Sequence, residues 1–190
     1  MLDISTNQQK ISIVIPVYNN FKNIPKILEN LTNQTFKPFE VIIIDSSTEN
    51  LTENYLINKK FNFSLIYKRV NNISYPGKAR NIGINLSKGN YLGFIDTKTI
   101  PDIHWIKECL ALVKNPIKCV IGGVNVQANS YFQKILRSTS YGIQNNETLV
   151  GTIIDKNFFK KIGFFNEYSR AGEDIDWLNR LKCFKENYIL

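Results

Sequence analysis

The segment Ile11-Ser-Ile-Val-Ile-Pro-Val-Tyr-Asn19 is the strongest single indication of the fold. It is almost continuously apolar as far as Val17, which is typical of a strand buried on both faces of a parallel sheet. Pro16 lies near the end of the segment, where a missing backbone donor is tolerated. Polar side chains, Tyr18 and Asn19, follow at once. The segment therefore predicts a central strand whose carboxyl end carries polar groups.

Similar apolar segments recur along the chain and alternate with helical patterns. Further strands are expected at about 41–44, 63–67, 90–95, 118–124, 149–154 and 187–190. Helices are expected at about 23–31, 50–60, 78–87, 101–113, 156–161 and 173–185, and loops with a short helix between 125 and 147. This β-α-β alternation with short connections predicts an α/β sandwich with a mostly parallel sheet.

Length and composition are those of one globular domain. The chain has 190 residues, of which 43% are hydrophobic and 21% charged, so it can bury a substantial core. No apolar run approaches the roughly 20 residues that a membrane helix needs, and the N-terminus lacks the apolar centre of a signal peptide. Because residues 187–190 look like the start of a strand, we expect the chain to be a fragment of a longer protein.

The cysteines give no sign of a disulfide framework or a metal site. Cys109, Cys119 and Cys183 are odd in number and do not have the spacing of metal ligands. We therefore expect reduced thiols in a cytoplasmic protein.

The net charge of +8 is unevenly distributed. Between Tyr55 and Ile95 there is no acidic residue, and the basic residues there are Lys59, Lys60, Lys68, Arg69, Lys78, Arg80 and Lys88. This bias suits a phosphate-bearing ligand or an anionic membrane surface, with a solvated basic face as the alternative. No nucleic-acid-binding motif is present, so we expect no nucleic-acid partner.

Polar residues follow three of the predicted strands. Tyr18 and Asn19 follow the first strand, Asp45 the second and Asp96 the fourth. In open α/β sheets, ligands bind at the carboxyl ends of the strands. Any one of these residues could serve only in a turn or cap, but together they predict a shared ligand crevice. The pattern alone does not choose the ligand.

Six segments in this order resemble those of family 2 glycosyltransferases of the GT-A fold. They are Ile11 to Asn19, Ile42-Ile-Ile-Asp-Ser-Ser-Thr48, Gly77-Lys-Ala-Arg-Asn-Ile-Gly83, Gly93-Phe-Ile-Asp96, Lys161-Ile-Gly-Phe-Phe-Asn-Glu167 and Gly172-Glu-Asp-Ile-Asp-Trp177. The resemblance implies a Rossmann-like three-layer sandwich over residues 1–190, with a nucleotide-binding half at about 11–100 and an acceptor-side half at about 101–190.

The resemblance also implies an activity. Such enzymes move a sugar from a nucleoside-diphosphate sugar, UDP-sugar by default, to an acceptor hydroxyl with inversion. The expected acceptor is a glycan or a lipid-linked intermediate of surface polysaccharide, and the expected location is cytoplasmic, with peripheral contact at the inner face of the membrane as an option. The alternative is a non-catalytic or degenerate sugar-nucleotide-binding module. A nucleotidyltransferase is a weaker alternative, because it does not explain the Glu173-Asp174 pair.

By resemblance, the donor nucleotide is held by residues of the first half. The backbone around Pro16, Val17 and Tyr18 holds the nucleoside, and Asp45 pairs with the base. The resemblance also implies that Arg80 lies near the nucleotide, and its guanidinium fork is well matched to phosphate. Its alternative role is to brace Asp45 or Asp96. Lys78 is a further nucleotide-binding candidate and equally well a solvated lysine.

The metal-binding motif departs from the family pattern. Asp96 matches the first aspartate of an Asp-X-Asp motif, in which carboxylates and the diphosphate share Mg²⁺ or Mn²⁺. The second aspartate is replaced by Lys98. Either Lys98 itself neutralises the diphosphate and the enzyme needs little or no metal, or Asp96 still holds a cation through diphosphate and water. The third option is loss of activity.

Glu173 and Asp174 are the predicted catalytic pair. By resemblance, Asp174 is the general base that takes the proton of the acceptor hydroxyl, and Glu173 is its supporting neighbour. Acidic residues at a helix start are also favoured by the helix dipole, which is the alternative explanation for Glu173.

Overall fold

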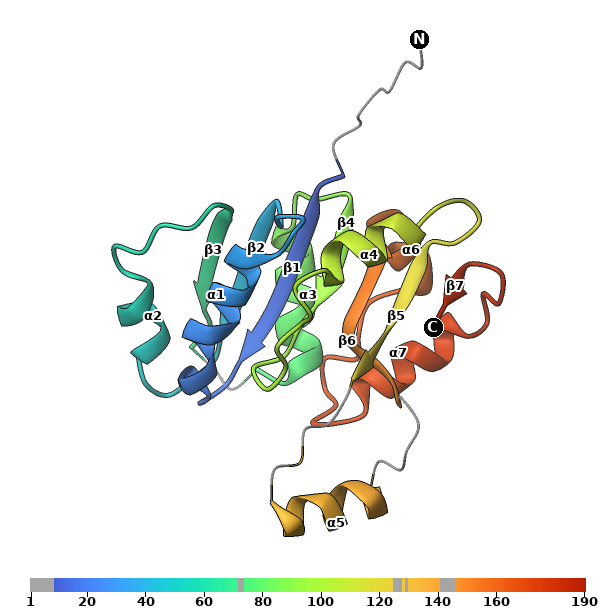
Figure 1. Ribbon diagram of the computed structural model, residues 1–190. Helices are drawn as coiled ribbons and strands as arrows, with labels where there is room; N and C mark the ends of the chain where they lie inside the picture. Colours follow the sequence, from blue (N-terminus) through green and yellow to red (C-terminus); the bar gives the residue numbers. More distant parts are fainter. Residues whose placement is uncertain (1–8, 72–73, 125–127, 129, 141–145) are drawn as a thin grey trace.

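The computed structural model describes residues 9–71, 74–124, 128, 130–140 and 146–190 (Figure 1). The strands are β1 (Ile11–Val17), β2 (Glu40–Asp45), β3 (Ser64–Arg69), β4 (Tyr91–Phe94), β5 (Cys119–Val124), β6 (Asn146–Asp155) and β7 (Tyr188–Ile189). The helices are α1 (Ile24–Asn33), α2 (Leu51–Leu56), α3 (Pro76–Leu86), α4 (Trp105–Leu112), α5 (Tyr131–Ser140), α6 (Lys156–Ile162) and α7 (Glu173–Leu181), with a short 3-10 turn, η1 (Phe21–Asn23).

The strands form one mostly parallel sheet. Its seven strands follow the order β3-β2-β1-β4-β6-β5-β7. Within the described strands, only β6 runs against its neighbours, pairing antiparallel with both β4 and β5. The central strand β1 pairs with β2 and β4. The carboxyl ends of these three strands therefore meet at one edge of the sheet, as the sequence predicts.

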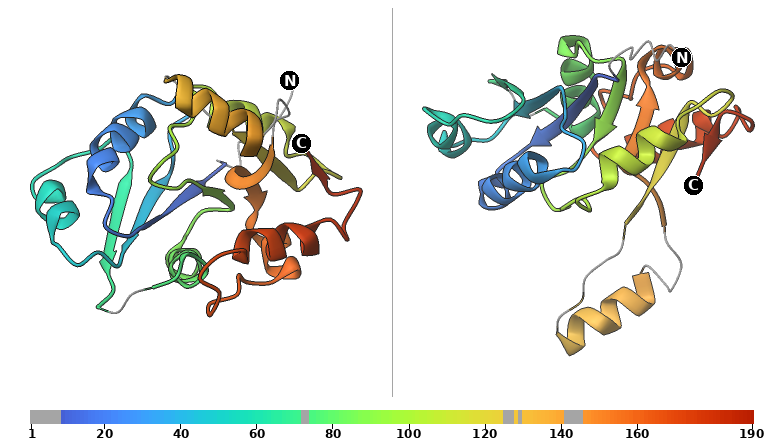
Figure 2. Two further views of the ribbon diagram at one scale, coloured as in Figure 1. Left: turned by 90° about the horizontal axis from the view of Figure 1, so that it is seen from below. Right: turned by 45° about the horizontal axis from the view of Figure 1, so that its top comes forward.

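Helices cover both faces of the sheet, which gives the predicted three-layer sandwich (Figures 1 and 2). Ile13 and Ile15 of β1 pack in the same core cluster as residues of α1 and α4. Val14 points to the opposite face, where its cluster contains residues of α3, α6 and α7. Because alternate side chains of one strand enter two cores, β1 is apolar at nearly every position.

Three helix boundaries differ from the sequence prediction. The helix expected from Pro101 begins at Trp105, because residues 101–104 form a loop that is held by the segment after α1: Thr35 N–H donates to Ile103 O. Helix α2 ends at Leu56, and Asn58 then adopts a positive φ of 66°, which no helix allows. Helix α7 ends at Leu181, short of the expected Lys185.

The region between β5 and β6 contains the expected short helix, α5, which lies away from the three layers (Figure 1). The loops expected around it fall in part outside the described residues. No helix in the described ranges combines the length and the apolar character required to cross a membrane.

Candidate functional site

A cleft of about 560 Å³ lies at the carboxyl ends of β1 and β4, against the start of α3. It brings together five of the residues expected from the sequence, namely Pro16, Val17, Tyr18, Arg80 and Asp96. It is also lined by Ser74, Tyr75, Pro76, Ala79, Thr97 and Arg170. We call this hollow the β1–β4 cleft. Of the strand-end residues for which the sequence predicts a shared crevice, Tyr18 and Asp96 line this cleft, whereas Asn19 and Asp45 do not.

Two asparagines of the loop after β1 hold the loop after β4 in place. Asn20 Nδ2 donates to Thr97 Oγ1, and Asn23 Nδ2 donates to Thr97 O, both at 2.8 Å. Asn23 therefore does not cap α1 with its side chain, although it occupies the N-cap position. These contacts fix Asp96, the neighbour of Thr97, relative to β1. These contacts join residues more than 70 positions apart, which no local pattern in the sequence reveals.

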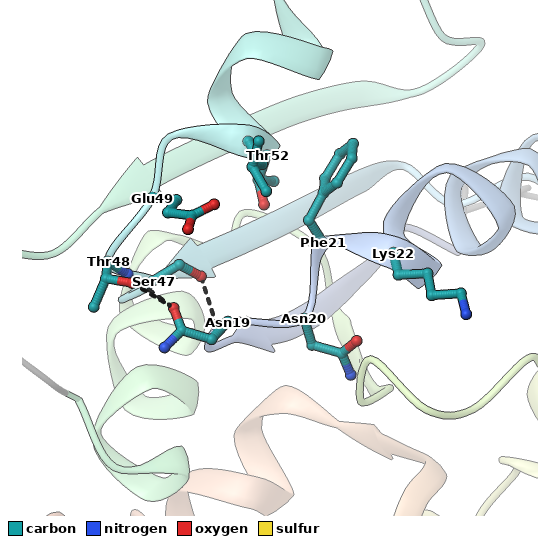
Figure 3. A pocket seen from close by; sticks show the side chains of 9 residues that line it. Asn19, Asn20, Phe21, Lys22, Ser47, Thr48, Glu49 and Thr52 are labelled. Carbon is teal, nitrogen blue, oxygen red and sulfur yellow. Dashed lines mark hydrogen bonds between the residues drawn. The ribbon is translucent and has the colours of Figure 1, made fainter.

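A second hollow, of about 690 Å³, lies between the loops after β1 and β2 (Figure 3). Asn19 bridges the two loops: its N–H donates to Ser47 Oγ at 2.8 Å, and its Oδ1 accepts from Thr48 N–H at 2.9 Å. Asn19 has a positive φ of 47°, a conformation that asparagine adopts more readily than most residues. The bridge explains why an asparagine follows Tyr18.

Asp45 is fully buried at the end of β2 and lines neither hollow. Its Oδ1 accepts from Ser47 N–H at 2.8 Å, and its Oδ2 accepts from Tyr67 OH at 3.2 Å. Burial, together with the nearby Asp45 carboxylate, raises the pKa of Tyr67 to about 12. In this structure Asp45 therefore organises the loop that follows β2.

Arg80 and Glu173 form a buried ion pair at the side of the cleft. Arg80 Nη1 lies 2.6 Å from Glu173 Oε1, and the two side chains are 8% and 5% exposed. The guanidinium also lies over the ring of Phe165, 5.6 Å from its centroid. Arg80 thus braces an acidic residue, as one alternative proposed, but the partner is Glu173 and not Asp45 or Asp96.

The close approach of α3 to the segment before α7 depends on Gly77. A Cβ at this position would collide with the carbonyl oxygen of Asn166 and press on Glu173 Cγ at 3.2 Å. Asn81 of α3 strengthens the contact, because its side chain donates to Phe165 O at 2.9 Å and accepts from Phe165 N–H at 3.1 Å. The face of α3 that carries Gly77 and Asn81 therefore packs against residues 165–173.

Asp174 is the second residue of α7 and is partly exposed. Its Oδ1 accepts from Ile175 N–H at 2.9 Å. Asp174 does not line the β1–β4 cleft, but its neighbour Glu173 contacts Arg80 of the cleft wall. The helix starts after Gly172, whose φ of 85° is readily available only to glycine.

Asp96 lines the cleft, whereas Lys98 and Lys78 are exposed and line neither hollow. Asp96 Oδ1 accepts from Lys98 N–H at 2.8 Å and from Thr99 Oγ1 at 2.9 Å. Across the described residues, no three His, Cys, Asp or Glu side chains gather as a metal site. Among the described lining residues, Asp96 is the one carboxylate of the β1–β4 cleft, which does not suffice for a cation held by protein alone.

The cysteines are all free thiols, as expected. Cys119 is buried, Cys109 is partly buried and Cys183 is exposed. Burial raises the pKa of Cys109 to about 11, so this thiol stays protonated and unreactive at neutral pH.

Comparison with known proteins identifies the family. The model of "Glycosyl transferase family 2" matches residues 12–175, so the chain belongs to this family, and the resemblance noted in the sequence is confirmed. A relative is the poly(ribitol-phosphate) beta-N-acetylglucosaminyltransferase TarP of Staphylococcus aureus, 26% identical over 203 residues that cover 96% of this chain and 60% of TarP. The chain spans about 60% of the length of the curated relatives that it matches along most of its own length.

Solved structures confirm the GT-A fold. Residues 1–349 of S. aureus TarS in complex with UDP-GlcNAc match with a TM-score of 0.67 and 21% identity, over 90% of this chain and 52% of that one. The mannosyltransferase PcManGT of Pyrobaculum calidifontis, in complex with GDP-Man and Mn²⁺, matches with a TM-score of 0.71 and 17% identity, over 95% and 54%. A metal ion thus accompanies the donor in one structural neighbour.

Proposed function

We propose that this glycosyltransferase moves a sugar from a UDP-sugar to an acceptor hydroxyl with inversion, in the synthesis of a surface glycan. The observation that carries the proposal is the β1–β4 cleft, in which Pro16, Val17, Tyr18, Arg80 and Asp96 lie together. The UDP-GlcNAc bound by TarS, a protein of the same fold, supports UDP as the nucleotide. The poly(ribitol-phosphate) acceptor named for TarP supports a surface polymer as the acceptor class.

The nucleoside occupies the part of the cleft next to β1. Tyr18 and Tyr75 both line the cleft and are 48% and 39% exposed, so their rings are available to stack on a base. Asp45 fixes the loop beside this region through Ser47, and pairs with the base once that loop adjusts to the nucleotide. Lys78 and Arg80 lie on the first two turns of α3. Lys78 contributes positive charge toward the diphosphate, whereas Arg80, whose charge is compensated by Glu173, contributes the remaining hydrogen-bond donors of its guanidinium.

Asp174 acts as the general base. Its carboxylate takes the proton of the acceptor hydroxyl as that oxygen attacks the anomeric carbon, and the bond to the departing diphosphate breaks on the opposite side of the sugar. This direct displacement inverts the anomeric configuration. Glu173 does not contact the acceptor in this scheme; it holds Arg80 and thereby sets the position of the first turn of α7.

Lys98 reduces the need for a metal ion. An ammonium group at the second position of the Asp-X-Asp motif supplies the positive charge that a divalent cation supplies elsewhere. The exposed lysine is free to turn toward a bound diphosphate, since its side chain is not buried. A cation, where present, would have Asp96 as its ligand from the cleft wall, with diphosphate and water completing its shell.

The second candidate function is a sugar-nucleotide-binding module without turnover. The same replacement of a carboxylate by Lys98 favours it, because a lost metal ligand is also what a degenerate enzyme would carry. Both candidates bind the donor, and only the first consumes it. In both, the protein binds its donor in the cytoplasm.

Calorimetric titration with UDP, GDP, dTDP and CDP, each in Mn²⁺ and in EDTA, tests the donor assignment. The proposal predicts that UDP binds more tightly than the other diphosphates, and that much of its affinity persists in EDTA. Binding of UDP only with Mn²⁺ would reject the role of Lys98. Failure of all four diphosphates to bind in either buffer would reject the function itself.

A further inference from the structure

We propose that the hydroxyl of Ser74 forms a hydrogen bond with the nucleoside-diphosphate donor and sets part of its affinity. This assignment rests on the proposed function. Ser74 lies just before α3 and lines the β1–β4 cleft, and neither the composition nor the family resemblance singled it out.

Ser74 is the exception among the buried polar side chains. The residue is 8% exposed, and among the described residues its Oγ is the one buried side-chain oxygen or nitrogen without a hydrogen-bond partner in the protein. Buried hydroxyl groups are nearly always paired, because an unpaired one loses its hydrogen bonds to water and gains nothing in return. A buried hydroxyl that faces a ligand cleft can regain its partner from the ligand.

Other buried serines show what a structural role looks like in this fold. Ser12 Oγ donates to Glu40 Oε1 at 2.6 Å, and Ser87 Oγ donates to Ile84 O at 2.6 Å. Each hydroxyl is satisfied within the protein, and neither residue lines the β1–β4 cleft. Ser74 is buried as well, but no described residue pairs with its hydroxyl.

The surroundings of Ser74 favour an anionic nucleotide over other ligands. Helix α3 begins two residues later and has no acidic residue in its first turn, so its start carries the positive end of the helix dipole. Arg170 lines the same cleft, as does Arg80, whose charge is compensated by Glu173. Pro16, Val17 and Tyr18, to which the proposed function assigns the nucleoside, complete the wall. A nucleoside diphosphate presents acceptor oxygens to these groups, and Ser74 adds a neutral donor beside them.

The test compares Ser74→Ala with Ser87→Ala, a matched removal of a buried hydroxyl that is paired and outside the cleft. UDP affinity is measured by calorimetry in EDTA, and the melting temperature is measured without nucleotide. We expect Ser74→Ala to weaken UDP binding by about 3- to 10-fold, the range of one neutral hydrogen bond. Its melting temperature should be equal to or above that of the wild type, since no protein hydrogen bond is lost. Ser87→Ala should show the reverse, with a lower melting temperature and unchanged UDP affinity.

Wild-type affinity in Ser74→Ala would overturn the inference and would mean that water alone satisfies the hydroxyl. A lower melting temperature of Ser74→Ala, with unchanged affinity, would overturn it too and would assign Ser74 a structural role. The wild type also tests the proposed function separately. If the wild type binds none of the four diphosphates, the donor assignment fails. If the wild type and Ser74→Ala bind UDP equally well, only the role of Ser74 fails.

Discussion

Arg80 Nη1 and Glu173 Oε1 lie 2.6 Å apart although 93 positions separate the two residues in the chain. Arg80 belongs to α3, which packs on β1 and lines the cleft, and Glu173 is the first residue of α7. The pair therefore joins the half of the domain that we assign to the donor to the helix that carries Asp174. Because both side chains are almost fully buried, each charge depends on the other for compensation.

Glu173→Gln should strongly destabilise the protein, because it leaves the Arg80 guanidinium buried without a counter-charge. We expect a loss of about 3 kcal/mol in the free energy of unfolding, measured by urea denaturation. Combining Glu173→Leu with Arg80→Met should cost less than either single change, since the double variant buries no charge. If the loss of unfolding free energy in the double variant equals the sum of the losses in Glu173→Leu and Arg80→Met, the two side chains do not interact.

Asp176→Asn is the matched control on the same helix. Asp176 pairs with Arg180 at 2.9 Å, but the two side chains are 54% and 34% exposed. Arg180 also donates to Ile162 O and Phe164 O and so remains held when the carboxylate is removed. A loss below about 1 kcal/mol is expected for this exposed pair. If Asp176→Asn lowered the free energy of unfolding as much as Glu173→Gln does, the destabilisation would come from losing any negative charge at the start of α7 and not from burial of the ion pair.

Lys98→Asp should make UDP binding depend on Mn²⁺. The change restores two carboxylates at the Asp-X-Asp positions and removes the ammonium group, so affinity in EDTA should fall by at least about 10-fold and recover with Mn²⁺. Lys88→Asp makes the same charge change at an exposed position outside the cleft. It should alter UDP affinity neither in EDTA nor with Mn²⁺. If Lys98→Asp responds to Mn²⁺ as the wild type does, the lysine does not replace a cation.

Tyr67 should make the fold sensitive to alkali. Its pKa is about 12 in the folded protein, against an ordinary value of 10.0, mainly because of burial and also because of Asp45. The unfolded chain therefore loses this proton first as the pH rises. The stabilising contribution of Tyr67 is complete below about pH 10 and is lost between about pH 10 and 12.

Tyr67→Phe should flatten the dependence of unfolding free energy on pH within that window, as measured by urea denaturation at several pH values. Tyr168→Phe, at a position that is 91% exposed, should retain the wild-type slope. The pKa assignment fails if the wild type and Tyr67→Phe lose stability in parallel above pH 10.

The sequence predicts the layers of the fold and half of the site. The apolar run of β1 signals a strand buried on both faces, and Ile13, Val14 and Ile15 do enter two different cores. Pro16 to Tyr18 and Asp96 meet in one cleft, because they terminate parallel neighbours of the same sheet. These features can be predicted from the sequence, because they follow from local hydrophobic pattern and from the geometry of parallel strands.

The remaining features depend on partners that no local pattern names. The pairing of Arg80 with Glu173, the hold of Asn20 and Asn23 on Thr97, and the unpaired hydroxyl of Ser74 all follow from how distant segments pack. Side-chain type indicates what Arg80 can bind but not which acidic residue lies beside it. The roles of Asp174, Lys78 and Lys98 stay predictions, because each would act through a ligand.

Turnover by the wild type and by Asp174→Asn tests the central claim most directly. UDP release from a set of UDP-sugars, UDP-GlcNAc among them, is measured with and without a surface-glycan acceptor, and UDP affinity is measured in parallel. The account predicts release by the wild type, a decrease of about 100-fold or more in Asp174→Asn, and nearly equal UDP affinity in both. Wild-type turnover in Asp174→Asn would reject Asp174 as the base, and a wild type that binds UDP but releases none from the sugar nucleotide would contradict a transferase and leave the binding module.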